Sequence, residues 1–300
     1  MKLGLRLLYL HADIPRTTRV VEEADRLGFE SVWLPEHLVL PADVVGSPET
    51  GHPSGVPSDW PWFDPFVYLA HLGARTRNIR LGTNVYVLAL RSPFVSARSI
   101  QTLDAVSEGR AEIGVGAGWV RGEWEAVGVE LSGRGRRLNE AIAVCRRLWT
   151  DDPVEYHGEF FDFEGVRFLP KPVQPGGPPL HIGGQSDVAL RRAARLGDGW
   201  IGQDHSPASV RPLVAELRRL LEAEGRTGEP FEITVRSEAT AIADLAEWED
   251  AGVSRLLITP WAGGGKDMVD IEQLLDGLHA FAEGHGTGEA PTAPLADGRL

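Results

Sequence analysis

The chain has 300 residues, 42% of them hydrophobic and 24% charged, a composition typical of a folded globular protein. Thirty Lys and Arg against 43 Asp and Glu give a formal net charge of −13, which argues against nucleic acid or an anionic membrane as the main partner. Cys145 is the single cysteine, so no internal disulfide or cysteine metal cluster can form, and no apolar run approaches the ~18 residues of a membrane span.

Apolar strand patterns alternate with helical patterns along the whole chain. Strands are predicted at 3–10, 29–34, 79–88, 111–115, 180–182, 199–202, 231–235 and 254–259. Helices are predicted at 15–27, 64–75, 93–106, 136–149, 188–196, 210–221, 242–246 and 271–281. Eight such units predict an α/β fold, a (β/α)8 TIM barrel with its active site at the carboxyl ends of the strands. A doubly wound sheet is the alternative, but the glycine-rich turn that it needs after its first strand is absent.

Two segments interrupt this alternation. Residues 38–62 form a long loop broken by five prolines, and a loop of this length inside a domain usually has a function. Residues 151–172 form an insertion with a hairpin-like alternation at 154–163. We therefore expect a single domain over 1–283 and a loose tail at 284–300.

Glycine-rich turns follow two of the strands. The glycines of 114–118 can offer free backbone amides to an anion or can simply make a tight turn. Gly183 and Gly184 precede Ser186 at a helix start, a pattern that favours phosphate binding over an ordinary capped turn. The run 263–266 is a rival phosphate site by its position after the eighth strand, although a flexible loop is the preferred interpretation.

Histidines and tryptophans are also predicted at this end of the barrel. Glu36 and His37 end the second strand, where a histidine beside a carboxylate can transfer protons; a salt-bridged loop pair is the alternative. Trp60 and Trp62 can wall a hydrophobic pocket or pin the long loop to the barrel. The histidines show no metal-ligand spacing, so no metal site is expected, and His181, inside a strand, is expected to be buried and hydrogen-bonded.

Six segments, in this order, resemble the luciferase-like monooxygenase family. They are residues 29–37, 79–85, 102–119, 170–179, 183–184 and 193–200, and the resemblance spans about 3–283. It is closest to the subgroup that uses the deazaflavin coenzyme F420. The resemblance implies a (β/α)8 barrel that binds a flavin or deazaflavin at its carboxyl mouth, and it implies a homodimer.

The resemblance also assigns residues to the cofactor. It implies a cis peptide bond between Asn84 and Val85 behind the ring of the cofactor. It implies backbone contacts to the cofactor phosphate at two strand ends, 116–118 and 183–186. With the neighbouring Trp119, the implied cofactor site comprises Asn84, Val85, Gly116, Ala117, Gly118, Trp119, Gly183, Gly184, Gln185 and Ser186. Glu36 and His37 match an aspartate–histidine pair of F420 relatives. Trp119 stands where such relatives often carry a glutamate, so a glutamate general acid and sugar-phosphate chemistry are not carried over.

The first functional hypothesis is an F420-dependent oxidoreductase that moves a hydride between the deazaflavin and a small organic substrate. His37 would donate or accept a proton, and Glu36 would orient it. The alternative is an FMN-dependent monooxygenase that uses O2 and reduced flavin from a partner reductase. A flavin-binding relative without catalysis is a third hypothesis. The protein is expected in the cytoplasm, with a substrate pocket lined by His11, Trp60, Trp62 and Trp261.

Overall fold

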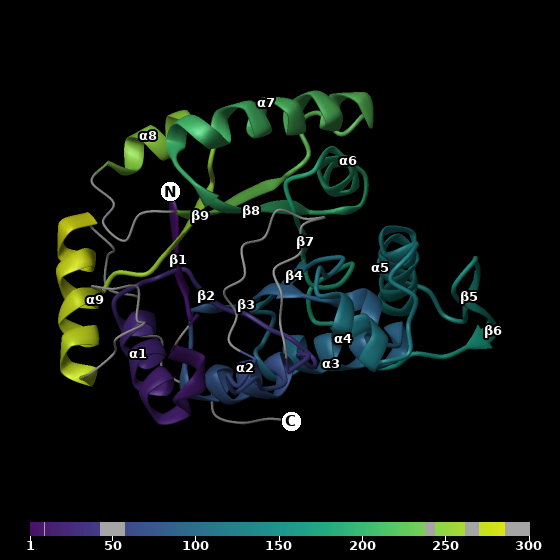
Figure 1. Ribbon diagram of the computed structural model, residues 1–300, viewed down its shortest axis with the longest axis horizontal. Coiled ribbons are helices and arrows are strands. Elements are labelled where there is room, and N and C mark those ends of the chain that lie inside the picture. Colours follow the sequence, from purple (N-terminus) through teal and green to yellow (C-terminus); the bar gives the residue numbers. More distant parts are fainter. Residues whose placement is uncertain (9, 43–57, 238–243, 262–269, 286–300) are drawn as a thin grey trace.

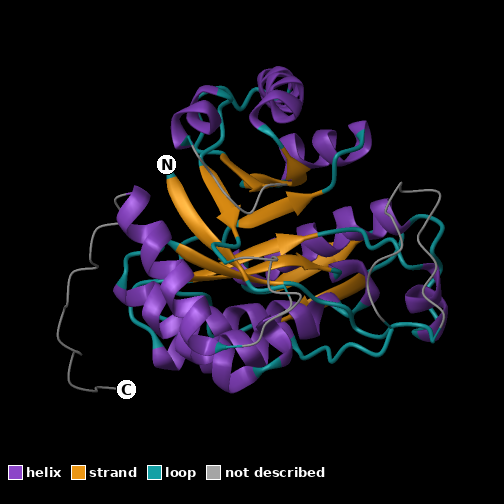
Figure 2. Cartoon of the chain, turned by 60° about the vertical axis from the view of Figure 1, so that its left-hand side comes forward, coloured by secondary structure: helices purple, strands orange, loops and turns teal. Residues whose placement is uncertain are grey.

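Eight parallel strands close into a barrel in the order β1-β10-β9-β8-β7-β4-β3-β2 (Figure 2). This computed structural model describes residues 1–8, 10–42, 58–237, 244–261 and 270–285. The barrel strands are β1 Lys2–Arg6, β2 Ser31–Leu34, β3 Arg80–Tyr86, β4 Ala111–Val115, β7 Leu180–Gly183, β8 Gly199–His205, β9 Glu232–Ser237 and β10 Arg255–Ile258. The predicted α/β barrel is confirmed.

Helices surround the barrel, with α1, α2 and α3 along one side and α7 and α8 along the opposite side (Figure 1). Helix starts carry their expected chemistry: the side chains of Asp13, Asp64, Ser186 and Ser206 cap backbone amides. No helix in these ranges is long and apolar enough to cross a membrane. The longer helices are α1 Ile14–Arg26, α2 Pro65–Arg75, α3 Pro93–Val106, α5 Arg134–Thr150, α6 Asp187–Leu196, α7 Pro207–Ala223 and α9 Ile271–His285, and the short ones are η1 Leu10–Ala12, η2 Leu88–Leu90, α4 Arg121–Ala126 and α8 Leu245–Asp250.

The structure corrects several predicted boundaries. The first strand ends at Arg6 rather than at residue 10, because the apolar run continues into η1 with Leu7 and Leu10 still fully buried. Helix α4 lies between the predicted strand at 111–115 and the predicted helix at 136–149, where no element was expected. Helix α9 continues to His285, so residue 284 does not begin a tail, and residues 286–300 lie outside the described ranges.

The insertion forms a hairpin, as predicted. Strands β5, Val154–His157, and β6, Asp162–Val166, pair antiparallel in a separate two-stranded sheet. In the long loop, positions 43–57 fall outside the described part of the chain.

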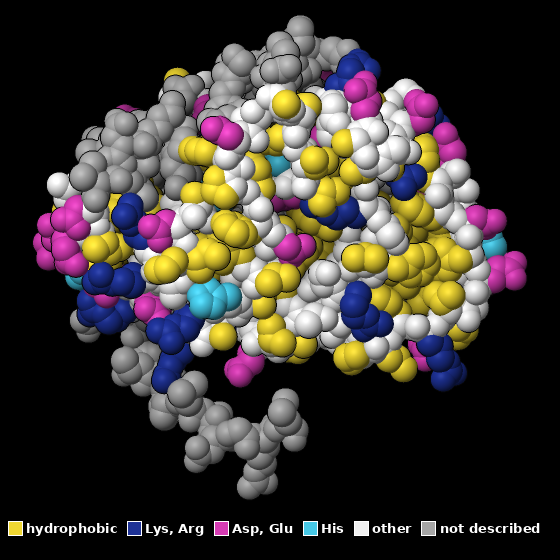
Figure 3. All heavy atoms as spheres, turned by 60° about the horizontal axis from the view of Figure 1, so that its bottom comes forward, with side chains coloured by type: hydrophobic (Ala, Val, Ile, Leu, Met, Phe, Trp, Pro, Cys, Tyr) yellow, Lys and Arg dark blue, Asp and Glu magenta, His cyan; other side chains and the backbone are white. Residues whose placement is uncertain are grey.

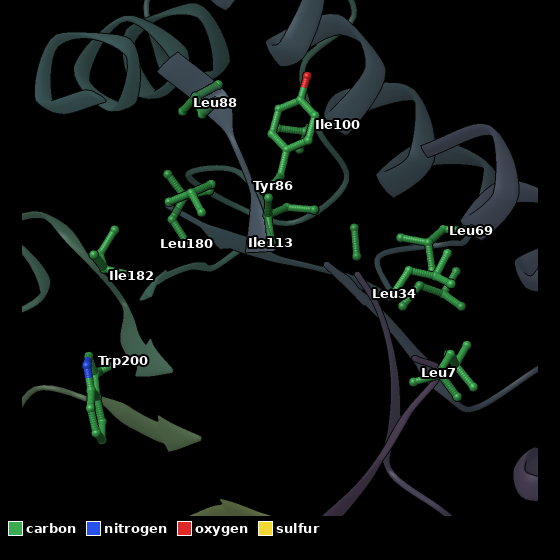
Figure 4. Packing of buried hydrophobic residues seen from close by; sticks show 14 of the residues in the cluster. Leu7, Leu34, Leu69, Tyr86, Leu88, Ile100, Ile113, Leu180, Ile182 and Trp200 are labelled. Atoms are coloured by element: carbon green, nitrogen blue, oxygen red, sulfur yellow. The ribbon is translucent and has the colours of Figure 1, made fainter. Parts of the chain in front are cut away.

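The inside of the barrel is filled by the indole of Trp33, which is fully buried beside Ile201 and Leu257. Glycines on neighbouring strands make this possible. A Cβ on Gly82 would lie 2.5 Å from the Trp33 ring, and one on Gly4 would lie 3.1 Å from its Nε1. The main core lies between barrel and helices, where Figure 4 shows side chains such as those of Leu34, Leu69, Ile100 and Ile113. Gly4 and Gly82 therefore serve packing.

A layer of charged side chains is also buried within the barrel. His181 Nε2 lies 2.6 Å from Glu112 Oε2, so the prediction of a buried, hydrogen-bonded His181 is confirmed. Arg255, which is fully buried, donates 2.8 Å hydrogen bonds to both carboxylate oxygens of Glu30 and lies 3.2 Å from Glu112. Its guanidinium also lies over the Trp33 ring, 5.3 Å from the centroid. The buried guanidinium of Arg255 thus has two anionic partners.

Candidate active site

Five aromatic rings meet at the carboxyl end of the barrel. The centroids of His11 and Trp62 lie 4.9 Å apart, as do those of His37 and Trp62, while Trp119 lies 6.0 Å from His37 and Trp60 lies 5.7 Å from His11. We call these five residues the aromatic group. They come from four separate segments: η1, the residues after β2, the long loop and the residues after β4. The structure therefore brings together residues that the sequence placed at the mouth one at a time.

The aromatic group is mainly an apolar wall. Burial lowers the pKa of His11, while the nearby carbonyl groups of Leu7 and Pro61 oppose the shift, so its ring is neutral at pH 7. The indole Nε1 of Trp62 is buried and has no hydrogen-bond partner in the part of the chain described. Such a donor can bind an oxygen of a ligand.

His37 is in contact with a buried carboxylate that the sequence analysis did not identify. Its Nδ1 lies 3.3 Å from Oε2 of Glu123, whose side chain is fully buried, and the Leu38 amide donates a 2.7 Å hydrogen bond to Oε1 of the same carboxylate. Glu123 belongs to α4, a helix of six residues without a capping side chain. So short a helix leaves no periodic pattern, and the sequence therefore carried no signal for it.

Glu36 occupies a different position from the expected one. Its fully buried carboxylate accepts hydrogen bonds of 2.8 Å from the Val87 amide and of 2.9 and 2.8 Å from the Arg91 guanidinium. The expectation that Glu36 orients His37 is therefore corrected: the carboxylate at His37 is Glu123. Glu36 instead holds the backbone just after β3.

The end of β3 has the predicted irregular geometry. The Asn84–Val85 peptide bond is cis, and the pairing of β3 with β4 shifts between Thr83 and Tyr86. The Val85 side chain fills the space beside two glycines, since a Cβ on Gly116 would lie 2.6 Å from it and one on Gly183 2.8 Å. The Asn84 Oδ1 is buried without a partner in the described ranges.

The turn between β7 and α6 is fixed from the neighbouring strand. Trp200 Nε1 donates a 2.7 Å hydrogen bond to the Gly184 carbonyl, and the Gln185 side chain donates a 2.8 Å bond to the Gln203 carbonyl. Gly184 has φ +118°, which favours glycine, and Ser186 caps the Ala189 amide. The other first-turn amides of a helix have no intrahelical acceptor and are suited to a phosphate.

Three observations fit a flavin-type cofactor at this mouth. The β3 bulge presents an unpartnered buried acceptor, Asn84 Oδ1. The turn at Gly184 ends at a helix N-terminus that is held in place by β8. Gly118, at φ +70°, has a backbone conformation that residues with a side chain rarely adopt, and a Cβ there would lie 2.7 Å from Val87. The backbone is thus closely packed at the two strand ends predicted to hold phosphate.

The remaining predicted residues are less closely associated with this site. Trp261 is 5% exposed and packs in the main core against α9, where a Cβ on Gly277 would lie 3.4 Å from its Cα. No ring contact joins Trp261 to the aromatic group in the described structure. Ala117 is partly buried against the core, and the rival run 263–266 lies outside the described residues.

The chain is similar to known proteins along most of its length. A family profile described as luciferase-like monooxygenase matches residues 1–292. An uncharacterized protein of Mycobacterium tuberculosis (strain ATCC 25618 / H37Rv) is 33% identical over 270 residues, covering 88% of this chain and 92% of the relative. An F420-dependent glucose-6-phosphate dehydrogenase of Kineococcus radiotolerans is 30% identical over 75% of this chain and 64% of its own. An FMNH2-dependent dimethylsulfone monooxygenase of Pseudomonas putida is 32% identical over 52% of this chain and 45% of its own.

Solved structures show the same fold. The monooxygenase RslO1 from Streptomyces bottropensis has a TM-score of 0.75 at 22% identity, and the alignment covers 95% of this chain and 98% of that one. An F420-dependent secondary alcohol dehydrogenase, solved with an F420-acetone adduct, has a TM-score of 0.73 at 16% identity with the same coverage. Both F420-dependent and FMN-dependent proteins thus occur among the similar chains.

Proposed function

Since the chain belongs to the luciferase-like monooxygenase family and is an enzyme of its oxidoreductase and monooxygenase kind, we propose that it is an F420-dependent oxidoreductase acting on a small organic substrate in the cytoplasm. The observation that carries the proposal is the position of His37. Its Nδ1 contacts a buried carboxylate and its ring adjoins Trp62 and Trp119, which leaves Nε2 to exchange a proton with a ligand. Hydride transfer to or from a carbon that bears oxygen needs such a proton exchange at the oxygen.

In this proposal, residues of the chain orient the cofactor and the substrate and transfer a proton at the substrate oxygen. The cofactor, when bound, supplies the carbon that gives or takes the hydride. Asn84 and Val85 would back its ring, and the amides at Gly184 and the start of α6 would hold its phosphate. The aromatic group would exclude water and hold the substrate, while His37 Nε2 would accept or return the proton of the substrate oxygen.

An FMN-dependent monooxygenase is the second candidate. The aromatic group is the observation that favours it, because a mainly apolar enclosure protects a reactive oxygen species from water. The fold similarity to the monooxygenase RslO1 agrees with it. This candidate requires a partner reductase that supplies reduced flavin.

Titration of the purified protein with F420 and with FMN, followed by fluorescence quenching, separates the two candidates. We expect tight binding of F420. Tight FMN binding without a response to F420 would favour the FMN-dependent monooxygenase over the F420-dependent oxidoreductase.

Gly184→Ala should weaken cofactor binding, since φ is +118° and the new Cβ would lie 2.9 Å from Ala189. The matched control is Gly176→Ala, which has φ +81° but open space and lies away from the mouth.

We also propose a homodimer, as the resemblance implies. On α2 and α3 the side chains of Val67, Val95 and Val106 are 72%, 61% and 57% exposed. Figure 3 shows this face, where apolar side chains gather among scattered charged ones. A second copy could cover such a surface. Sedimentation should give a dimer mass, and Val95→Asp should shift it toward the monomer; a wild-type monomer mass would refute the proposal.

A further inference from the structure

Glu123 lies where it can control the proton on His37. Its carboxylate is fully buried and makes two contacts. Oε1 accepts a hydrogen bond from the Leu38 amide, and Oε2 lies 3.3 Å from Nδ1 of His37. When Glu123 is ionised, its carboxylate can only accept hydrogen bonds, and this contact then places a proton on Nδ1. The neutral ring then carries its lone pair on Nε2.

The surroundings offer His37 no competing carboxylate among the residues described. The Glu36 side chain, next in the chain, is already bound by Arg91 and the Val87 amide. Trp62 and Trp119 approach the His37 ring at interplanar angles of 79° and 80°, and an indole nitrogen is a donor that cannot accept the Nδ1 proton.

We propose that Glu123 is a positioning residue that fixes His37 in its Nδ1–H tautomer, so that Nε2 can accept the proton of the substrate. The inference rests on the proposed proton-transfer role of His37. During oxidation of an alcohol, Nε2 of His37 would accept the hydroxyl proton as the C=O bond forms, and a bound deazaflavin would supply the carbon that takes the hydride. The carboxylate of Glu123 stabilises the resulting imidazolium and takes up no proton itself.

Glu123→Gln tests this inference because it inverts the tautomer without changing the shape. The amide oxygen would still accept from Leu38, and the NH2 group would then donate to Nδ1, which moves the ring proton to Nε2. We expect ¹⁵N NMR of the histidine-labelled protein to show the two His37 nitrogens exchanging protonation, with signals assigned by their loss in His37→Ala. We expect kcat to fall by about 10²-fold or more, with F420 affinity changed less than about twofold. The matched control is Glu125→Gln, an exposed glutamate on the same helix, which should change neither readout.

A double-mutant cycle shows whether Glu123 acts through His37. Glu123→Gln combined with His37→Ala should be no slower than His37→Ala alone. Additive losses, or an unchanged tautomer in Glu123→Gln, would overturn the inference. If Glu123→Gln fails to fold, Glu123→Asp should keep the Nδ1–H signal and part of the activity, and a lost signal there would count against it. The NMR measurement needs no cofactor. A failure of F420 to bind would therefore refute the proposed function, whereas the tautomer of His37 is tested by the NMR signals alone.

Discussion

Individual residues at the barrel interior explain why glycine stands at particular positions on the strands. Trp33 fills the space that several ordinary side chains would occupy, and Gly4 and Gly82 leave room for it. Val85 is accommodated in the same way by Gly116 and Gly183. Glycine at these positions is a matter of volume, because a Cβ would overlap a neighbouring side chain.

Gly82→Ala should therefore destabilise the protein. The new Cβ would lie 2.5 Å from the Trp33 ring, which has no open space to move into. We expect the free energy of unfolding to fall by about 1–3 kcal/mol, measured by urea denaturation. The control Gly284→Ala, in α9 with nothing within 4 Å, should cause no loss. Equal losses in the two variants would show that the packing around Trp33 is not the cause.

His37→Ala should lower turnover by about 10²- to 10⁴-fold, the range for a general acid or base, while leaving cofactor affinity nearly unchanged. The control is His157→Ala in the exposed hairpin, where the histidine pairs with Asp162 and should not affect the rate. Rates close to wild type in His37→Ala would exclude His37 from proton transfer.

The junction between β3 and α3 depends on one buried ion pair. Glu36, at the end of β2, holds Arg91 and the Val87 amide, and Arg91 also lies over the Tyr86 ring, 4.4 Å from its centroid. The pair thus connects β2 to the segment that follows the cis peptide bond. The ion pair therefore sets the position of Asn84 and Val85, which we propose to lie behind the cofactor ring, relative to His37.

Arg91→Ala tests the role of this junction. It would leave the Glu36 carboxylate buried without its cation, so we expect a loss of about 3–5 kcal/mol in the free energy of unfolding and weaker cofactor binding. Arg19→Ala is the control, since its pair with Glu272 has side chains 54% and 65% exposed and should contribute little. A loss in Arg91→Ala no larger than in the control would contradict this role.

At the scale of the whole molecule, the buried charges connect strands that are far apart in sequence. β1 pairs with β10 and so closes the barrel, and Arg255 of β10 contacts both Glu30 before β2 and Glu112 of β4. Burial acts to raise the pKa of Glu112, but the hydrogen bond from His181 and the charges of His181, Arg255 and Arg80 outweigh it and hold the pKa well below its usual value. The ionised form of Glu112 is therefore part of the folded barrel.

This depressed pKa predicts acid sensitivity. Its contribution to stability is present above the unfolded-state pKa near 4.5 and is lost as the pH falls from there toward the folded-state pKa. Glu112→Gln should lower the free energy of unfolding at pH 7 and reduce its further loss below about pH 4.5. Urea denaturation across this pH range measures both effects. Glu216→Gln, at an exposed pair with Arg219, should behave nearly as wild type, and an acid response in Glu112→Gln as steep as in wild type would contradict the prediction.

The sequence by itself determined the barrel and indicated several residues at its mouth, but not Glu123. Buried strand patterns and their alternation with helices are local signals, and they located the eight strands and the strand-end residues His11 and His37, whereas Trp119 was assigned through the resemblance. The cis bond at Asn84–Val85 followed from resemblance.

Only the tertiary structure decided which side chains work together. Glu36 is next to His37 in the sequence, yet its carboxylate binds Arg91, and the partner of His37 is Glu123, 86 residues away. Two side chains at the end of a strand point in different directions, and a six-residue helix leaves no periodic trace, so neither fact could be read from the chain. Hydrogen-bond partners of this kind are set by the closure of the barrel, which brings the ends of distant strands to one mouth.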